Sequence, residues 1–133
     1  MEDVFIARVM SAGVTTVSPG TSVEEAAQKM LAEDIGSVVV IDENDELAGI
    51  LTTTDFVRIV AERQPKDDST VEEFMTSDVH TVGAQDVVTD VAKQLIEHGV
   101  HHLPVVDEDN HVIGIVTTTD LTSYVSTLDE HDE

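Results

Sequence analysis

The sequence predicts an α/β fold of two β-α-β-β-α repeats with pseudo-twofold symmetry and small sheets packed against helices. The first observation is an internal repeat, because shifting the 133-residue chain by 65 positions aligns its halves without a gap. Gly49–Asp55 then falls on Gly114–Asp120, with Leu51 against Val116 as the single difference. The second is that both halves alternate strand and helix patterns in the same order. We expect one repeat over residues 1–65, a second over 66–128 and a disordered tail at 129–133.

The first repeat begins with an extended piece at residues 14–17. A helix follows, because Ser22 and Glu25 have the spacing of a capping box and an apolar stripe continues to Leu31. The apolar run 38–41 is typical of a strand buried on both faces, and the polar turn 42–45 leads into a second strand at 47–52. We expect Thr54 or Asp55 to cap a closing helix that ends near residue 63.

The second repeat shows the same elements in the same order. An extended piece at 79–82 precedes an apolar helical stripe over 88–96, and the run 103–106 and the segment 112–117 predict two strands joined by a polar turn. Thr119 or Asp120 is expected to cap a helix to about residue 127. A polar connector at 64–69 joins the repeats, and Thr70 with Glu73 predicts a short capped turn after it.

Composition restricts the partners of this chain. Six Lys and Arg against 28 Asp and Glu give a net charge of −22, which repels nucleic acids and anionic membranes. Such a surface suits a salt-rich cytoplasm, where screening removes the self-repulsion, so we expect a halophilic protein. No Cys is present, which excludes disulfides and thiolate ligands, and no apolar stretch approaches 18 residues. We therefore expect a cytoplasmic protein that binds neither nucleic acid nor membrane.

A short signature recurs in both repeats and carries a family resemblance. It has the form Gly-h-h-Thr-x-x-Asp, where h is apolar, and stands at residues 49–55 and 114–120. With the paired helix and strand positions and the segment His101-His102-Leu103-Pro104, it resembles a tandem pair of cystathionine beta-synthase (CBS) domains, or Bateman module, from about Val9 to Val125. The resemblance implies a regulatory sensor for adenosine compounds such as AMP, ADP, ATP or S-adenosylmethionine, bound in two clefts between the repeats.

The residues of the signature suit that chemistry. Thr52 and Thr54 lie where a strand passes into a helix, so their hydroxyls and free N–H groups at the helix N-terminus can receive phosphate oxygens. A carboxylate at Asp55 can accept both hydroxyls of a ribose, as in dinucleotide sites. Thr117, Thr119 and Asp120 repeat this arrangement. Helix capping by the two aspartates alone is the structural alternative.

The resemblance also implies which residues complete each cleft. The first ligand site would comprise Ile50, Thr52, Thr54, Asp55, Val79, His80, Val100, His101, His102 and Pro104. The second would comprise Val14, Thr15, Ile35, Gly36, Ser37, Ile115, Thr117, Thr119 and Asp120. In the similar pattern of the gamma subunit of AMP-activated protein kinase, the position of His102 is Arg. Because Gly36 and Ser37 replace the two histidines, we expect the second cleft to take a less charged ligand or to stay empty.

Other functions were weighed against ligand sensing. His98, His101 and His102 are closely spaced, but adjacent strand residues point to opposite faces, so we expect no metal site. The sequence contains no Cys nucleophile, Gly-x-Ser-x-Gly, Walker loop or His-Glu-x-x-His, and its Thr-rich turn offers no placed base, so we do not expect an enzyme. We expect no required cofactor, an adenine nucleotide or S-adenosylmethionine-type ligand with or without Mg²⁺, a homodimer, and a separate downstream protein. A dimerisation or interaction adaptor without a ligand is the alternative.

Overall fold

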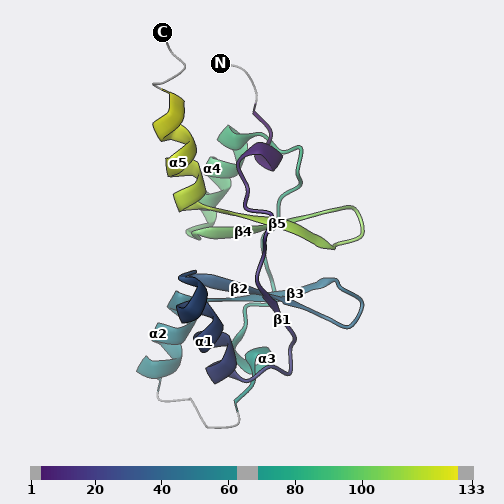
Figure 1. Ribbon diagram of the computed structural model, residues 1–133, viewed down its shortest axis with the longest axis vertical. Coiled ribbons are helices and arrows are strands. Elements are labelled where there is room, and N and C mark those ends of the chain that lie inside the picture. The colour runs from purple at the N-terminus through teal and green to yellow at the C-terminus, as the bar shows by residue number, and fades with distance from the viewer. Residues whose placement is uncertain (1–3, 63–68, 129–133) are drawn as a thin grey trace. The chain divides into compact units, whose positions relative to one another are not determined.

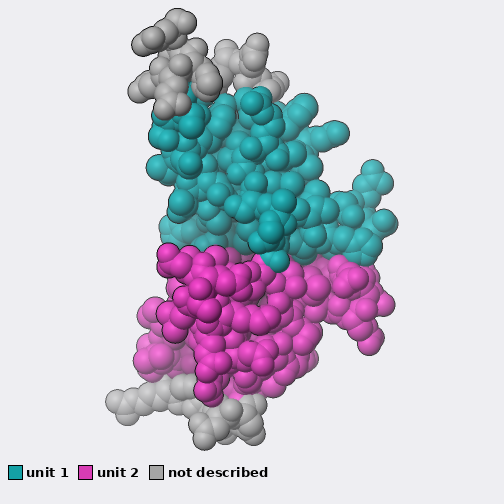
Figure 2. All heavy atoms as spheres, viewed as in Figure 1, with its two compact units in different colours: residues 1–14, 80–133 teal, residues 15–79 magenta. Residues whose placement is uncertain are grey.

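The computed structural model describes residues 4–62 and 69–128 (Figure 1). Residues 63–68, with most of the expected connector, and the expected tail at 129–133 lie outside the described residues. The chain forms two compact units, coloured separately in Figure 2: unit 1 comprises Met1–Val14 and His80–Glu133, and unit 2 comprises Thr15–Val79. The boundaries fall at equivalent places in the 65-residue repeat. Unit 1 therefore contains the leading segment of the first repeat, residues 1–14, with the remainder of the second repeat. Unit 2 contains the leading segment of the second repeat, residues 66–79, with the remainder of the first.

Unit 2 is a three-stranded sheet with helices. Its elements are β1 (Thr16–Val17), α1 (Val23–Glu33), β2 (Ser37–Ile41), β3 (Leu47–Thr52), α2 (Thr53–Ala61) and α3 (Val71–Phe74). Strand β2 is central, parallel to β1 and antiparallel to β3. The first four residues of β2 are buried, which confirms the prediction of a strand covered on both faces.

Unit 1 contains elements equivalent to those of unit 2, but its sheet has two strands. Its elements are η1 (Ile6–Arg8), α4 (Val88–His98), β4 (His102–Val106), β5 (Val112–Thr117) and α5 (Thr118–Leu128), with β4 antiparallel to β5. The strand expected at 79–82 is reduced to one parallel bridge, Val82 with Val105. Pro104 explains the difference, because it has no N–H, whereas the equivalent Val39 donates its N–H to the Thr15 carbonyl at 3.1 Å.

The two hydrophobic cores consist of equivalent residues. Residues 65 positions apart occupy the same places in them, down to the leading segments, where Ile6 corresponds to Val71. The unit 1 core contains Ile6, Val82, Val91, Leu95, Leu103, Val105 and Val116. The unit 2 core contains Val71, Val17, Ala26, Met30, Val38, Val40 and Leu51. The repeat therefore extends from sequence to packing.

A close approach fixes each leading segment against its sheet. The residues after the short helices pair with β3 and β5, as Thr76 with Ile50 and Ser11 with Ile115. Beside these bridges, a Cβ placed on Gly49 or Gly114 would meet a methionine sulfur at 2.7 Å or 2.5 Å. An added carbon at either place would therefore have to displace a neighbouring group.

The observed helix caps correct two expectations and confirm two. Thr52 is the N-cap of α2 and Asp55 is its third residue, so neither Thr54 nor Asp55 caps this helix as expected. Helix α5 likewise begins at Thr118, one residue before the expected cap at Thr119 or Asp120. The capping threonine of α2 lies two residues before the expected Thr54, because a capping box reads Thr-x-x-Asp from the N-cap. The caps at Ser22 and at Thr70 with Glu73 are confirmed.

Candidate functional site

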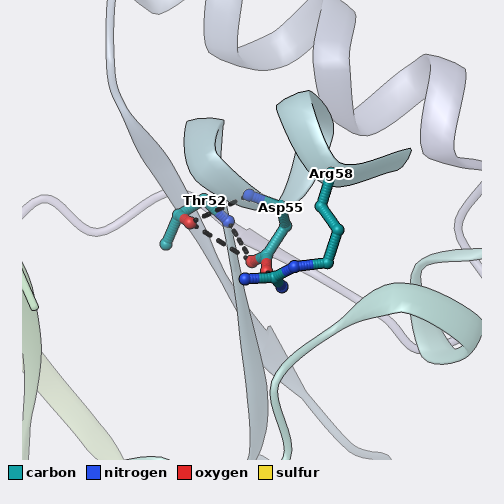
Figure 3. Close-up of polar contacts among 3 residues, drawn as sticks. All are labelled: Thr52, Asp55 and Arg58. Carbon is teal, nitrogen blue, oxygen red and sulfur yellow. Dashed lines mark hydrogen bonds and ion pairs between the residues drawn. The ribbon is translucent and has the colours of Figure 1, made fainter. Parts of the chain in front are cut away.

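The junction between β3 and α2 holds a carboxylate in a fixed position (Figure 3). Asp55 Oδ2 accepts the Thr52 N–H at 2.8 Å and the Thr52 hydroxyl at 3.2 Å, while the Asp55 N–H reaches Thr52 Oγ1 at 3.4 Å. This reciprocal pair satisfies groups that the end of a strand and the start of a helix would leave open. The aspartate is 5% exposed, so its direction is set by these bonds.

The junction between β5 and α5 repeats the arrangement. Asp120 Oδ2 accepts the Thr117 N–H at 2.9 Å, and the Asp120 N–H donates to Thr117 Oγ1 at 3.1 Å. The other carboxylate oxygen accepts the Ser11 hydroxyl at 3.3 Å. Asp120 is half-buried, so this carboxylate is more open than that of Asp55.

A cation distinguishes the first junction from the second. Arg58, one turn after Asp55 on α2, places Nη1 3.1 Å from Asp55 Oδ1. The equivalent residue in α5 is the exposed Ser123. Sequence reasoning did not single out Arg58, although an acid and a base three residues apart on a helix are a recognisable pair once the helix start is known.

The helix N-termini offer fewer open amide groups than the sequence led us to expect. In α2 the Thr53 N–H donates to the Gly36 carbonyl at 3.0 Å and the Asp55 N–H is used by Thr52. In α5 the Thr118 N–H donates to the His101 carbonyl at 3.1 Å. The exposed side chains of Thr54 and Thr119 therefore remain as the accessible hydroxyls of the predicted phosphate subsites.

Within each unit, the residue that begins β2 or β4 lies beside the aspartate junction of the same unit. His102 pairs in register with Thr117, and its pKa is lowered, chiefly by burial and further by His101, while Asp120 opposes the shift. In unit 2 the equivalent Ser37 pairs with Thr52. Our assignment of the histidines to the cleft of Asp55, and of Gly36 and Ser37 to that of Asp120, concerns the relation between units and stays a prediction.

In each unit, the segment before the first α-helix contacts the C-terminal end of that helix through two side chains. The residues that make this contact are equivalent in the two repeats. In unit 2 the Thr15 hydroxyl donates to Glu33 Oε1 at 2.5 Å. In unit 1 the imidazoles of His80 and His98 stack with centroids 3.6 Å apart and planes 9° from parallel. His80 is therefore held against α4, through a partner that we had considered only as a metal ligand.

The apolar residues of the predicted sites lie along the strands and at the helix ends. Ile50 and Pro104 are buried, and Ile115 is half-buried and in register with Pro104. The half-buried Ile35 and Val100 follow α1 and α4, where their N–H groups bond to helix carbonyls at 3.0 and 3.1 Å. Val14 and Val79, both half-buried, stand at the unit boundaries, in units 1 and 2 respectively.

Among residues 4–62 and 69–128, one group has the proximity of metal ligands, and it does not include His98, His101 or His102, which we had weighed and set aside. Asp107, Asp109 and His111 place ligand atoms within 4.8 Å of one another. A turn explains the group: Asp107 Oδ1 accepts the N–H of Asp109 and of His111, and the His111 N–H is the main cause of the lowered Asp107 pKa. Asp42 makes the same two bonds in unit 2, where Asn44 replaces Asp109.

A surface hollow of about 670 Å³ lies in unit 2 beside β1 and the turn between β2 and β3. It contains none of the predicted site residues, since its lining is Thr16, Val17, Ser18, Pro19, Thr21, Lys29, Ile41, Asp42 and Glu43. Nor is any helix in the described part of the chain long and apolar enough to cross a membrane.

Fold and site together define a duplicated α/β module. In each half, the Thr and Asp of a Thr-x-x-Asp motif are joined by reciprocal hydrogen bonds where a strand passes into a helix. The model of the CBS domain matches residues 6–62 and 71–127, so the chain belongs to the CBS domain family. The resemblance seen in the sequence is thereby confirmed.

Solved structures agree with this membership. The CBS domain pair of protein MJ0100, in complex with 5′-methylthioadenosine and S-adenosyl-L-methionine, has a TM-score of 0.88 and 28% identity, covering 96% of this chain and 99% of that one. CBSX2 in complex with AMP has a TM-score of 0.85 and 26% identity, covering 94% and 98%. A homoserine O-acetyltransferase of Methanococcoides burtonii is 36% identical over 87% of this chain, which spans 23% of that protein's length.

Proposed function

We propose that this chain is a regulatory module that binds adenosine-containing ligands at its two strand-to-helix junctions and passes the signal to a separate protein. The observation that carries the proposal is the pair of locked carboxylates, Asp55 and Asp120, each held by its own strand end. Such a carboxylate is suited to accepting ribose hydroxyls because its direction is fixed before the ligand arrives. The CBS pairs that bind AMP, 5′-methylthioadenosine and S-adenosyl-L-methionine support the ligand class.

The ligand residues proposed for each junction are those that the resemblance implied. Ile50, Pro104 and Ile115 would face the adenine base. Thr54 and Thr119 would bind the phosphates, or the group that stands in their place in a ligand such as S-adenosylmethionine. The relative with an acetyltransferase name supports a regulatory role next to an enzyme, because the similar region there is a minor part of a longer chain. A cytoplasmic location, and Mg²⁺ with a phosphorylated ligand, complete this proposal.

The test is isothermal titration of the full chain with AMP, ATP, 5′-methylthioadenosine and S-adenosylmethionine. We expect at least one to bind and Asp55→Ala to weaken it at the first junction, with circular dichroism to verify folding. Asp55→Asn is the matched variant, since it keeps an oxygen for the Thr52 N–H and loses the charge. No heat and no rise in melting temperature with any of these compounds would reject ligand sensing.

A second observation favours self-association. Leu31 and Ile96, equivalent residues of α1 and α4, are 83% and 81% exposed, and the equivalent Val60 and Val125 are 71% and 59% exposed. Large apolar side chains that recur at equivalent exposed positions are typical of an interface. We propose a homodimer through these helices, tested by light scattering of the wild type and of Leu31→Ser with Ile96→Ser. An adaptor without ligand would keep this dimer and show no binding heat.

The acidic surface supports adaptation to high salt. At a net charge of −22, self-repulsion is strong in dilute buffer and is screened within a few ångströms at molar salt. We propose that the protein works in a salt-rich cytoplasm, and unfolding measured against KCl concentration tests this.

A further inference from the structure

One cation has a special place in this acidic chain. Within the described residues, Arg58 is the one Lys or Arg that forms an ion pair with a carboxylate, and that carboxylate is Asp55 of the first junction. The side chain of Asp55 is 6% exposed and that of Arg58 is 59% exposed. The pair, drawn in Figure 3, therefore joins a buried acid to a largely exposed arginine side chain.

The bonds of the carboxylate show where a ligand hydroxyl can enter. Asp55 Oδ2 already accepts two donors from Thr52, whereas Oδ1 accepts a single one, from Arg58 Nη1 at 3.1 Å. A carboxylate oxygen has room for two hydrogen bonds. A ribose hydroxyl that binds Asp55 through Oδ1 therefore arrives directly beside the guanidinium, and either shares the oxygen with Arg58 or displaces it.

Displacement has different costs for different ligands. An uncharged nucleoside that takes Oδ1 loosens Arg58 from a buried carboxylate and gives the cation nothing in return. A ligand with a phosphate brings an anion to a guanidinium that has further N–H donors and belongs to a largely exposed side chain, and such charge-assisted bonds are among the strongest in proteins. The electrostatics of the junction thus favour the phosphorylated ligand.

The second junction has no cation in the equivalent place, so it does not distinguish phosphorylated from uncharged ligands in this way. Ser123 stands in the place of Arg58, and the Asp120 oxygen equivalent to Oδ1 accepts the neutral Ser11 hydroxyl at 3.3 Å. His102 beside it has a lowered pKa, mainly through burial, and so stays neutral at neutral pH. An uncharged ligand there displaces no ion pair.

We propose that Arg58 is a specificity residue that makes the Asp55 junction select ligands bearing a phosphate over the corresponding nucleoside. The proposal rests on the proposed function, since it concerns the ligand of the same junction. It assigns to α2 a role that the sequence signature, which ends at Asp55, does not include.

The experiment compares AMP with adenosine by isothermal titration of the full chain, in an Asp120→Ala background that isolates the first junction. We expect Arg58→Ser, which installs the residue of the second repeat, to weaken AMP by about 10- to 100-fold, the value of a charge-assisted hydrogen bond, and to leave adenosine unchanged or tighter. Arg58→Lys should restore part of the AMP affinity. Lys93→Ser removes the same charge from an exposed position of α4 and should leave the ratio of the two affinities unchanged.

The reciprocal change is Ser123→Arg in an Asp55→Ala background, which should shift the second junction towards AMP. If Arg58→Ser alters both ligands equally, or neither, the specificity role is rejected while ligand sensing stands. If the wild-type chain binds neither AMP nor adenosine, but binds 5′-methylthioadenosine or S-adenosylmethionine, the specificity role alone is rejected. If none of the four compounds binds, the proposed function is rejected with it.

Discussion

The two glycines that face methionines offer a test of how closely the repeats resemble each other. A Cβ on Gly114 would lie 2.5 Å from Met10 Sδ and 3.1 Å from the Ser11 carbonyl oxygen, whereas a Cβ on Gly49 would lie 2.7 Å from Met75 Sδ and 2.8 Å from the Thr76 carbonyl oxygen. A methionine sulfur can move aside, because the side chain is flexible. Neither backbone oxygen can, since the Thr76 and Ser11 oxygens accept the Ile50 and Ile115 N–H groups at 3.0 and 2.9 Å. The Thr76 oxygen is the closer of the two to the added carbon, at 2.8 Å against 3.1 Å.

Gly49→Ala should therefore cost more than Gly114→Ala. Overpacking costs about 1–3 kcal/mol, and alanine returns about 0.4–1 kcal/mol through the unfolded chain, so we expect about 1 kcal/mol for Gly114→Ala and about 2 kcal/mol for Gly49→Ala. Urea denaturation of each variant measures these free energies. Gly13→Ala is the matched control, because nothing lies within 4 Å of its added carbon.

Double-mutant cycles sharpen the difference. Met10→Ala should remove most of the cost of Gly114→Ala, whereas Met75→Ala should remove only part of the cost of Gly49→Ala, because the Thr76 oxygen remains. If the two double mutants regain the same fraction of the lost free energy of unfolding, the distinction between a clash with a flexible side chain and a clash with a backbone oxygen is refuted.

Three further results are expected. Asp55→Ala should lower the free energy of unfolding by about 2–3 kcal/mol in thermal or urea denaturation, and Asp120→Ala by about 1 kcal/mol, because the first carboxylate is more buried and also pairs with Arg58; the reverse order would contradict this account. The pKa of His102 is lowered, chiefly by burial, so the unfolded chain binds the proton at higher pH and stability falls as the pH drops below about 6.5. His102→Ser should weaken that fall, and parallel stability curves against pH would argue against it. Raising KCl from about 0.1 M to about 2 M should raise the melting temperature, and a loss of stability would count against charge screening.

Much of the fold could be predicted because the information is local and occurs twice. The strands at 38–41 and 47–52 were identified from apolar runs between turn residues, and the structure extends them by no more than one residue. The strand expected at 79–82 failed for a reason that involves a distant residue, since Pro104 lacks the N–H that a longer parallel pair needs. The sequence of residues 79–82 does not show which strand they will pair with.

The site was predicted in part for the same reason. The signature that contains Thr52 and Asp55 is local, so both residues were singled out, but the hydrogen bonds between them were not expected and the cap was placed two residues too late. Arg58 was missed because the signature ends at Asp55, and its role follows only from the distance between the two side chains. The exchange of leading segments could not be read either, since both repeats offer equivalent apolar positions at Ile6 and Val71.

That exchange imposes an order on folding during synthesis. Unit 2 is complete once residue 79 has left the ribosome, whereas Ile6 finds its core neighbours only when residues 82–116 have followed. Unit 2 can therefore fold before the leading segment of the first repeat has a sheet to pack against. A translational pause after residue 79 would hold the chain with one finished unit and an unpaired N-terminal arm.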